Sequence, residues 1–235
     1  MELRDSAAHV FVVPDALDSE DSIALDPTDA HHLERVLRLR AGEVVSVSDG
    51  RGRWRPARWV SGGALAPCGA VQGAESAQPP LTVGFTPVKG DRPEWMVQKL
   101  TELGVDRIVP LRAARSVVRW EGDRAGAQVD RLRRVAREAA MQSRRCTLPV
   151  VDDLTDVGAV PGALAELGGA PISLEQPTVL IGPEGGWSPA ETEGRAHVSL
   201  GPLVLRAETA AMAAAVLLGA LRFHTVVTSE RGPWS

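Results

Sequence analysis

The first third of the chain alternates apolar and polar positions over short stretches, which is the pattern of half-buried strands. Asp49-Gly50 separates two such stretches and is typical of a hairpin turn. Pro56 lies inside the second stretch and suggests an edge strand, because proline has no N–H to donate to a sheet. These residues predict a small β-barrel with strands at 9–13, 43–48 and 53–60 and one helix at 29–39.

The rest of the chain alternates apolar strand-like runs with helical patterns, which predicts a parallel sheet and an α/β fold. Residues 67–80 are small, polar and turn-rich, so they mark a domain boundary. We expect domains at 1–72 and 81–235, joined by a linker at 73–80. In the second domain, strands are expected at 81–85, 107–111, 178–181 and 196–200, a weaker strand at 162–166, and helices at 91–103, 127–144 and 210–221.

The helix expected at 210–221 carries no polar side chain on any face. Such a helix must be buried all round. In a domain of this size, that suggests packing against a second subunit as well as against its own sheet.

A glycine-rich turn follows the strand at 178–181 and leads directly into a helix start. It reads Gly-Pro-Glu-Gly-Gly from Gly182, and Ser188 with Glu191 has the spacing of a capping box. Glycines let a ligand approach the backbone closely, and a helix start offers free N–H groups. No Gly-Lys-Ser/Thr follows, so this is not a phosphate-binding P-loop. Taken alone, the turn is equally compatible with a tight structural connection.

The same architecture recurs at 200–209, which reads Leu-Gly-Pro-Leu-Val-Leu-Arg-Ala-Glu-Thr. A strand end passes through a Gly-Pro turn into a loop that opens the apolar helix. Arg206 and Glu208 are the charged pair of this otherwise apolar loop.

Composition narrows the function classes. The net charge is −4, yet residues 112–145 hold ten arginines against four acidic residues, and residues 31–60 hold seven against three. Two basic regions on an acidic chain suit local nucleic-acid binding or a solvated surface equally well. Two cysteines make neither a disulfide framework nor a zinc site, and the longest apolar run is too short to span a bilayer. We expect a soluble cytoplasmic protein without a metal or a membrane partner.

Together the two Gly-Pro signatures resemble those of the RsmE family, the 16S rRNA (uracil-1498-N3)-methyltransferases of the SPOUT superfamily. His31-His-Leu-Glu-Arg-Val-Leu-Arg resembles the family's N-terminal motif, and 89–105 resembles its helix after the first strand of the second domain. Residues 138–145 resemble its basic helix end, although Met141 and Arg144 stand where the family has Glu and Gly. The segment 153–177 looks short and poor in strand residues compared with the family.

The resemblance implies an N-terminal PUA-like β-barrel, a C-terminal trefoil-knotted SPOUT domain, a homodimer, and S-adenosylmethionine (SAM) as methyl donor. It implies 16S rRNA in the small ribosomal subunit as the partner. We expect Arg206 to stabilise negative charge on the uracil, and Glu208 to orient Arg206 or accept a proton, or only to cap the helix and pair with Arg206. The expected SAM-binding residues are Leu164, Glu166, Gly182, Pro183, Glu184, Gly185, Leu200, Gly201, Leu203, Leu205 and Arg206.

RNA contacts are expected from both basic regions, since guanidinium and ammonium groups bind phosphates. Trp54, Trp59 and Trp95 are expected in the core rather than stacked on bases. Two other functions stay open: a SPOUT ribose 2′-O-methyltransferase, which usually carries Asn in a Ser-Leu-Asn loop where this chain has Arg206 to Thr209, and a non-catalytic RNA-binding ribosome-assembly factor. The expected RNA-binding residues are Arg35, Arg38, Lys89, Arg92, Arg115, Arg119 and Arg145.

Overall fold

A computed structural model describes residues 3–73 and 77–226, and within them the chain forms two compact units. The first comprises the described part of Met1–Ser76 together with Ala136–Pro149, and the second comprises Ala77–Val135 with the described part of Val150–Ser235. The sequence had assigned 136–149 to the second domain. That stretch joins the first unit because its backbone bonds there: the Leu148 N–H donates to the Gly50 carbonyl at 2.9 Å, and Ser48 Oγ donates to the Cys146 carbonyl at 2.7 Å.

The first unit is built on a six-stranded sheet in the order β1-β3-β4-β5-β2, with β6 also paired to β4. β1 runs parallel to β3, and the other neighbours are antiparallel. The strands are β1 (Ala8–Phe11), β2 (Ile23–Ala24), β3 (Val44–Ser48), β4 (Arg53–Ser61), β5 (Ala64–Pro67) and β6 (Gln72–Gly73). Short helical segments join them: η1 (Leu3–Asp5), α1 (Pro14–Leu17), α2 (Pro27–His31) and η2 (His32–Val36).

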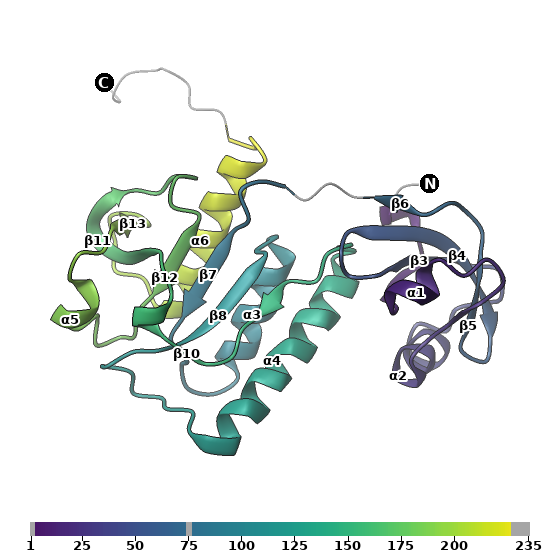
Figure 1. The fold of residues 1–235 in the computed structure, drawn as a ribbon, viewed down its shortest axis with the longest axis horizontal. Helices are drawn as coiled ribbons and strands as arrows, with labels where there is room; N and C mark the ends of the chain where they lie inside the picture. The colour runs from purple at the N-terminus through teal and green to yellow at the C-terminus, as the bar shows by residue number, and fades with distance from the viewer. Residues whose placement is uncertain (1–2, 74–76, 227–235) are drawn as a thin grey trace. The chain divides into compact units, whose positions relative to one another are not determined.

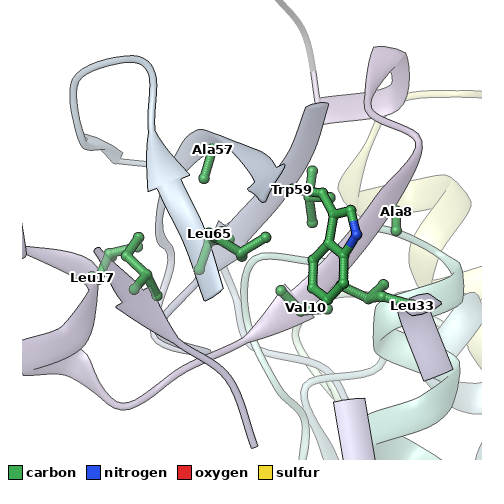
Figure 2. Packing of buried hydrophobic residues seen from close by; sticks show 10 residues of the cluster. Ala8, Val10, Leu17, Leu33, Ala57, Trp59 and Leu65 are labelled. Carbon is green, nitrogen blue, oxygen red and sulfur yellow. The ribbon is translucent and has the colours of Figure 1, made fainter. Parts of the chain in front are cut away.

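Alternate strand residues of this unit point into one apolar core, as the period-2 pattern predicts. Val10, Leu33 and Leu65 are fully buried, and Trp59 is nearly so; Figure 2 shows them in one cluster. Trp54 is also buried, so it and Trp59 are core residues as expected. Trp95, in the second unit, is 45 % exposed, contrary to that expectation.

Two local expectations are wrong. β4 is a central strand, because it pairs with β3 and with β5. Pro56 is tolerated in this central strand because no ladder hydrogen bond needs its missing N–H. Its carbonyl accepts the Cys68 N–H at 3.1 Å on the β5 side, and the β4–β5 pairing ends next to Pro56, at Ala57 and Pro67. The helix expected at 29–39 begins at Pro27, capped by Asp26, turns into a π-helix at His32 and ends at Val36.

His9 gives the first unit a pH-dependent stability. Burial lowers the pKa of its imidazole to about 4, despite a raising contribution from the Arg145 backbone. In the unfolded chain, the His9 imidazole therefore binds a proton below about pH 6.5. In the folded unit, it remains neutral until the pH falls to about 4. Stability should fall as pH drops through that window, by on the order of 3 kcal/mol at its lower end.

The measurement is urea unfolding between pH 7 and pH 4, followed for wild type and His9→Gln. The glutamine variant keeps a polar group near Ser46, whose Oγ lies 2.8 Å from Nδ1 of His9, but it does not titrate. Its stability should fall less steeply with acid than that of wild type. Parallel curves for the two proteins would contradict the prediction.

The second unit contains a seven-stranded parallel sheet in the order β10-β8-β7-β12-β11-β13, with β9 also paired to β8. The parallel α/β expectation is confirmed, whereas the knotted threading of the chain stays a prediction. The strands are β7 (Thr82–Phe85), β8 (Arg107–Arg112), β9 (Val150–Val151), β10 (Thr155–Asp156), β11 (Ala163–Pro171), β12 (Thr178–Ile181) and β13 (His197–Ser199).

The helices of this part of the chain are α3 (Arg92–Glu102), α4 (Gly122–Gln142), α5 (Pro189–Thr192) and α6 (Ala207–Arg222), and η3 (Val157–Ala159) is a 3-10 turn. α6 packs on β7 and β12 and against α3 (Figure 1). Its core-facing side is buried, but Val216 is 49 % and Leu221 is 40 % exposed. The helix expected to be buried all round therefore keeps an apolar side uncovered in the single chain.

The segment at 153–177 holds more order than its composition indicates. β11 extends the strand expected at 162–166 to Pro171, with a bulge between Ala165 and Ala170. Arg195, which the sequence did not single out, donates to the carbonyls of Val157, Val160 and Gly162 at 2.6–2.9 Å. The Arg195 side chain thereby holds the segment that leads into β11 against the residues that precede β13. The sequence contains no indication of this role of Arg195, because all three of its hydrogen-bond acceptors are backbone atoms.

Candidate functional site

Most expected cofactor residues of the second unit, and Arg206, lie in connections that leave one edge of its sheet, whereas Leu164 and Glu166 lie in β11 and Glu208 lies in α6. Because all strands run parallel, the loops that follow β7, β8, β12 and β13 emerge together at the carboxyl edge. In open α/β sheets, ligands bind at this edge. The glycine-rich turn follows β12, and the loop with Arg206 follows β13.

The glycines after β12 are explained first by packing within the unit. A Cβ on Gly182 would come within 2.8 Å of the Trp187 ring, and one on Gly185 within 3.3 Å of Arg115. Gly186 has a φ of +68°, which non-glycine residues rarely adopt. Pro183 is buried and Glu184 is exposed. The backbone of this turn is still at the carboxyl edge, but its missing side chains make room for protein atoms.

Glu191 ties the glycine-rich turn to the loop after β8. Its carboxylate accepts the Ser188 N–H at 2.7 Å, as the capping-box spacing predicts, and the Ala114 N–H at 2.8 Å. Partial burial alone would raise the pKa of this carboxyl, but the two backbone hydrogen bonds lower it below its ordinary value. Arg115 adds a 3.3 Å bond to the Gly185 carbonyl. The two loops therefore form one fixed structure.

A pocket of about 170 Å³ lies between the β11 bulge and the loop after β13, and it collects five of the expected SAM-binding residues. Leu164 is not among them: its side chain is fully buried in the core with Leu180 and Trp187, so only its backbone is available to a ligand. Gly182 to Gly185 do not line it either. The pocket residues are Ala165, Glu166, Leu167, Leu200, Gly201, Leu203, Val204, Leu205 and Ala210.

The chemistry of this pocket fits a SAM-type ligand. A Cβ on Gly201 would meet no atom within 4 Å, and the φ of Gly201 is +141°, so its Cα faces open space. Its carbonyl accepts from Ser199 Oγ at 3.1 Å, and its N–H donates to the same oxygen at 3.4 Å. Leu203 and Val204 expose 72 % and 84 % of their surface, so the rim of the pocket is apolar. Glu166 adds a carboxylate beside the His197 ring, suited to a cationic or hydroxyl group. Apolar walls, an open glycine and one acid match the parts of SAM.

Arg206 and Glu208 stand at the start of α6. Arg206 is its N-cap residue, is exposed, and makes no side-chain cap bond. Glu208 is half-buried in the first turn, where a helix favours negative charge. Of the alternatives left open for Glu208, pairing with Arg206 is not found among the described contacts: Glu208 Oε1 lies 3.3 Å from Nη1 of Arg92 on α3. The structure thus joins an expected catalytic residue to an expected RNA-binding residue.

The remaining expected RNA-binding residues divide between the units. Lys89, Arg115 and Arg119 are exposed in the loops after β7 and β8. Arg35 and Arg38 are exposed in the first unit, where Arg38 has a φ of +54°. Arg145 belongs to the first unit and is half-buried.

Arg144, which stands where the family has Gly, has a φ of +56°, and Nη1 of its guanidinium donates to Ser6 Oγ at 2.8 Å. Glycine adopts that φ freely, so the left-handed backbone at position 144 accounts for the glycine that the family resemblance expects there.

Within 3–73 and 77–226, no group of three or more His, Cys, Asp or Glu side chains is arranged to hold a metal ion. None of the helices in these ranges is both long enough and apolar enough to cross a membrane.

Two family models match the chain. One, described as an RNA methyltransferase domain, matches residues 75–219, and the other, described as an RNA methyltransferase PUA domain, matches residues 25–59. The first match covers the parallel sheet from β7 to β13 and most of α6, and the second covers α2, η2, β3 and most of β4.

Similar proteins agree with these matches. Ribosomal RNA small subunit methyltransferase E of Mycobacterium bovis is 32 % identical over 243 residues, covering 91 % of this chain and 91 % of that protein. The Neisseria gonorrhoeae structure titled as the same enzyme, bound to S-adenosyl methionine, has a TM-score of 0.77 at 26 % identity and covers 91 % of this chain and 97 % of its own. A probable rRNA-methyltransferase from Porphyromonas gingivalis has a TM-score of 0.75 at 28 % identity, covering 93 % and 100 %.

Proposed function

Because the chain belongs to the RsmE family and is a SAM-dependent rRNA methyltransferase with a PUA-like first unit, we propose that it methylates N3 of a uridine in 16S rRNA of the small ribosomal subunit. The observation that carries this proposal is the pocket beside Arg206. It gathers the loop after β13 and the β11 bulge around the open Cα of Gly201, next to the exposed Arg206, whose guanidinium has no hydrogen bond or ion pair within the described residues.

We propose that SAM occupies this pocket, with Leu203 and Leu205 against its apolar parts and the Gly201 backbone at its polar edge. Glu166 and Leu200 complete the lining, while Leu164 and the turn from Gly182 to Gly185 contribute backbone only. When bound, SAM supplies an electrophilic methyl group on its sulfonium. The protein's task is to hold the uracil so that N3 faces that methyl group.

Uridine N3 is a weakly acidic imide and must lose its proton before it attacks. We propose that the proton passes to the Glu208 carboxylate, directly or through one water, and that its electron pair spreads over N3 and the two carbonyl oxygens. Arg206 stabilises that negative charge. Arg92 holds Glu208 in position through their ion pair, which assigns Arg92 a second role beside phosphate binding.

RNA binding by the exposed arginines should be strongly salt-dependent, because each phosphate contact releases counterions. With all seven expected contacts formed, affinity for an rRNA fragment should fall roughly 10³–10⁴-fold between 50 and 200 mM salt. Removing Arg115 or Arg119 should reduce the slope of log affinity against log salt by about one unit each. Fluorescence anisotropy at four salt concentrations measures this, with Arg134→Ala on α4 as the charge-matched control. A flat salt dependence would refute phosphate binding.

We further propose a homodimer and a cytoplasmic location. The exposed apolar residues Val216 and Leu221 of α6, with Phe223 at 53 % exposure just beyond it, support a second copy packed on this helix. Since 16S rRNA is the proposed substrate, the enzyme must work where small subunits are assembled.

The direct test is transfer of a labelled methyl group from SAM to small subunits and to naked 16S rRNA, followed by mapping of the modified nucleotide. Label on N3 of one uridine is the expected result. Label on a ribose 2′-oxygen would instead support the 2′-O-methyltransferase alternative, against which stands the Arg206-Ala207-Glu208-Thr209 sequence.

A further inference from the structure

A second cavity, of about 390 Å³, opens at the carboxyl edge of the same sheet, beside the ends of β8 and β10. Its volume falls within the range of small-ligand sites, about 300–1,000 Å³. It shares no residue with the pocket proposed for SAM. Leu111, Val118, Trp120 and Val157 supply apolar walls.

Sheet geometry separates the two pockets. β7 and β12 lie between β8 and β11, so β8 and β11 are three strand spacings apart, or about 14 Å. A ligand in the second cavity therefore does not reach a methyl group held beside β11 of the same chain. The second cavity suits something that lies near the reacting base without being that base.

The polar groups of the cavity are unequally engaged. Arg112 is paired with Asp156 at 2.9 Å, and Glu191 already accepts two backbone N–H groups. Ser116 differs, because its Oγ is buried and has no hydrogen-bond partner among the described residues. Burying a hydroxyl without a partner is costly, so this atom favours a ligand with a polar edge.

A cation and a flat wall complete the chemistry. Arg119 lines the cavity, is exposed, and is held by no hydrogen bond or ion pair within the described part of the chain. Trp120 is 5 % exposed and forms part of the apolar wall. A planar group with a hydrogen-bonding edge and an attached anion matches this set, and a nucleotide has all three features.

We propose that this cavity binds one unpaired nucleotide of the rRNA substrate, a neighbour of the methylated uridine, and so helps to select the site. The inference rests on the proposed rRNA substrate. The base packs on the wall that contains Trp120, its edge bonds to Ser116 Oγ, and its phosphate faces Arg119. Proteins commonly recognise RNA sequence through such splayed, unstacked bases.

A glycine in the cavity allows a clean test. Gly158 lines it, and a Cβ added there meets no atom within 4 Å, so Gly158→Phe should place a ring at the cavity without a clash at its Cβ. Gly126 on α4 also has open space at its Cβ and lies outside the cavity, so Gly126→Phe is the matched control. Both full-length variants are assayed with SAM and an rRNA fragment, alongside Ser116→Ala.

Gly158→Phe should lower kcat/KM for RNA at least tenfold, with SAM affinity and Tm unchanged, while Gly126→Phe stays at the wild-type value. Ser116→Ala should lower it about threefold to tenfold, as loss of one hydrogen bond predicts. Fragments with a single abasic nucleotide, moved stepwise from the target, identify the bound base. At one abasic position, wild type should lose as much kcat/KM as Gly158→Phe loses on the intact fragment. At that same position, the Gly158→Phe variant should lose no further kcat/KM.

The inference would be overturned if Gly158→Phe methylated RNA at the wild-type rate. It would also be overturned if every abasic fragment lowered kcat/KM equally in wild type and in Gly158→Phe. Titration with nucleoside 5′-monophosphates distinguishes a nucleotide of the RNA from a free nucleotide as the ligand of the cavity. Tight binding of a free nucleotide, together with unchanged RNA turnover in Gly158→Phe, would assign the cavity to free nucleotides. That result would also overturn the inference. If wild type methylates no rRNA, the proposed function fails separately. RNA affinity of the same variants then still decides whether the cavity binds RNA.

Discussion

Arg206→Ala should lower the rate of methyl transfer roughly 10²–10³-fold, the range seen when one group that stabilises a developing oxyanion is removed. The structure places Arg206 at the N-cap of α6, exposed and without a side-chain cap bond, so its replacement by alanine removes no capping hydrogen bond of the helix start. Leu205 and Gly201 line the pocket proposed for SAM, and Arg206, although expected among the SAM-binding residues, does not. The guanidinium is therefore free to act on the substrate, and SAM affinity should stay near the wild-type value.

Single-turnover transfer with saturating SAM and RNA measures this effect, and calorimetry measures SAM affinity. Arg206→Lys keeps the charge but not the planar fork, so it should recover only part of the rate. Arg134→Ala, on the exposed side of α4, is the control for loss of one positive charge. Wild-type turnover in Arg206→Ala would remove Arg206 from the mechanism.

Gly201→Trp should weaken SAM binding by more than about 100-fold, or about 2.7 kcal/mol. Gly201 lines a pocket of about 170 Å³, and a side chain built on it projects into open space. An indole there occupies the volume that the cofactor requires. The fold should survive, because the added Cβ meets no atom within 4 Å.

The control must also replace a glycine of positive φ, since Gly201 has a φ of +141° and any side chain is unfavourable there. Gly194 has a φ of +67°, also with no atom near its Cβ, and lies outside the pocket. Gly194→Trp should bind SAM like wild type, with a smaller loss of Tm than Gly201→Trp, because non-glycine residues reach a φ near +67° at lower cost than one near +141°. Unchanged SAM affinity in Gly201→Trp would show that the cofactor lies elsewhere.

The sequence was most informative where periodicity and turn chemistry act locally. The strand at 178–181 and the capping contact between Ser188 and Glu191 follow from residue order alone, and both are present. The all-apolar pattern of α6 also predicted its contact with the sheet. These features depend on neighbours a few residues apart.

Features that depend on distant partners were not visible. Glu208 lies two residues from Arg206, yet its partner is Arg92, which approaches only because α3 packs against α6. Gly182 and Gly185 suggested an approach route for a ligand, whereas Trp187 and Arg115 occupy the space. Arg195 bonds to three carbonyls, and backbone acceptors leave no mark in a sequence.

If this chain transfers a methyl group from SAM to N3 of one uridine in 16S rRNA, that modification depends on its gene. Mass spectrometry of nucleosides and fragments of 16S rRNA, from cells with and without the gene, tests it most directly. The account predicts that N3-methyluridine at a single position disappears with the gene and returns when wild-type protein, but not Arg206→Ala, is restored. An unchanged N3-methyluridine content, or loss of a ribose methyl group instead, would contradict it.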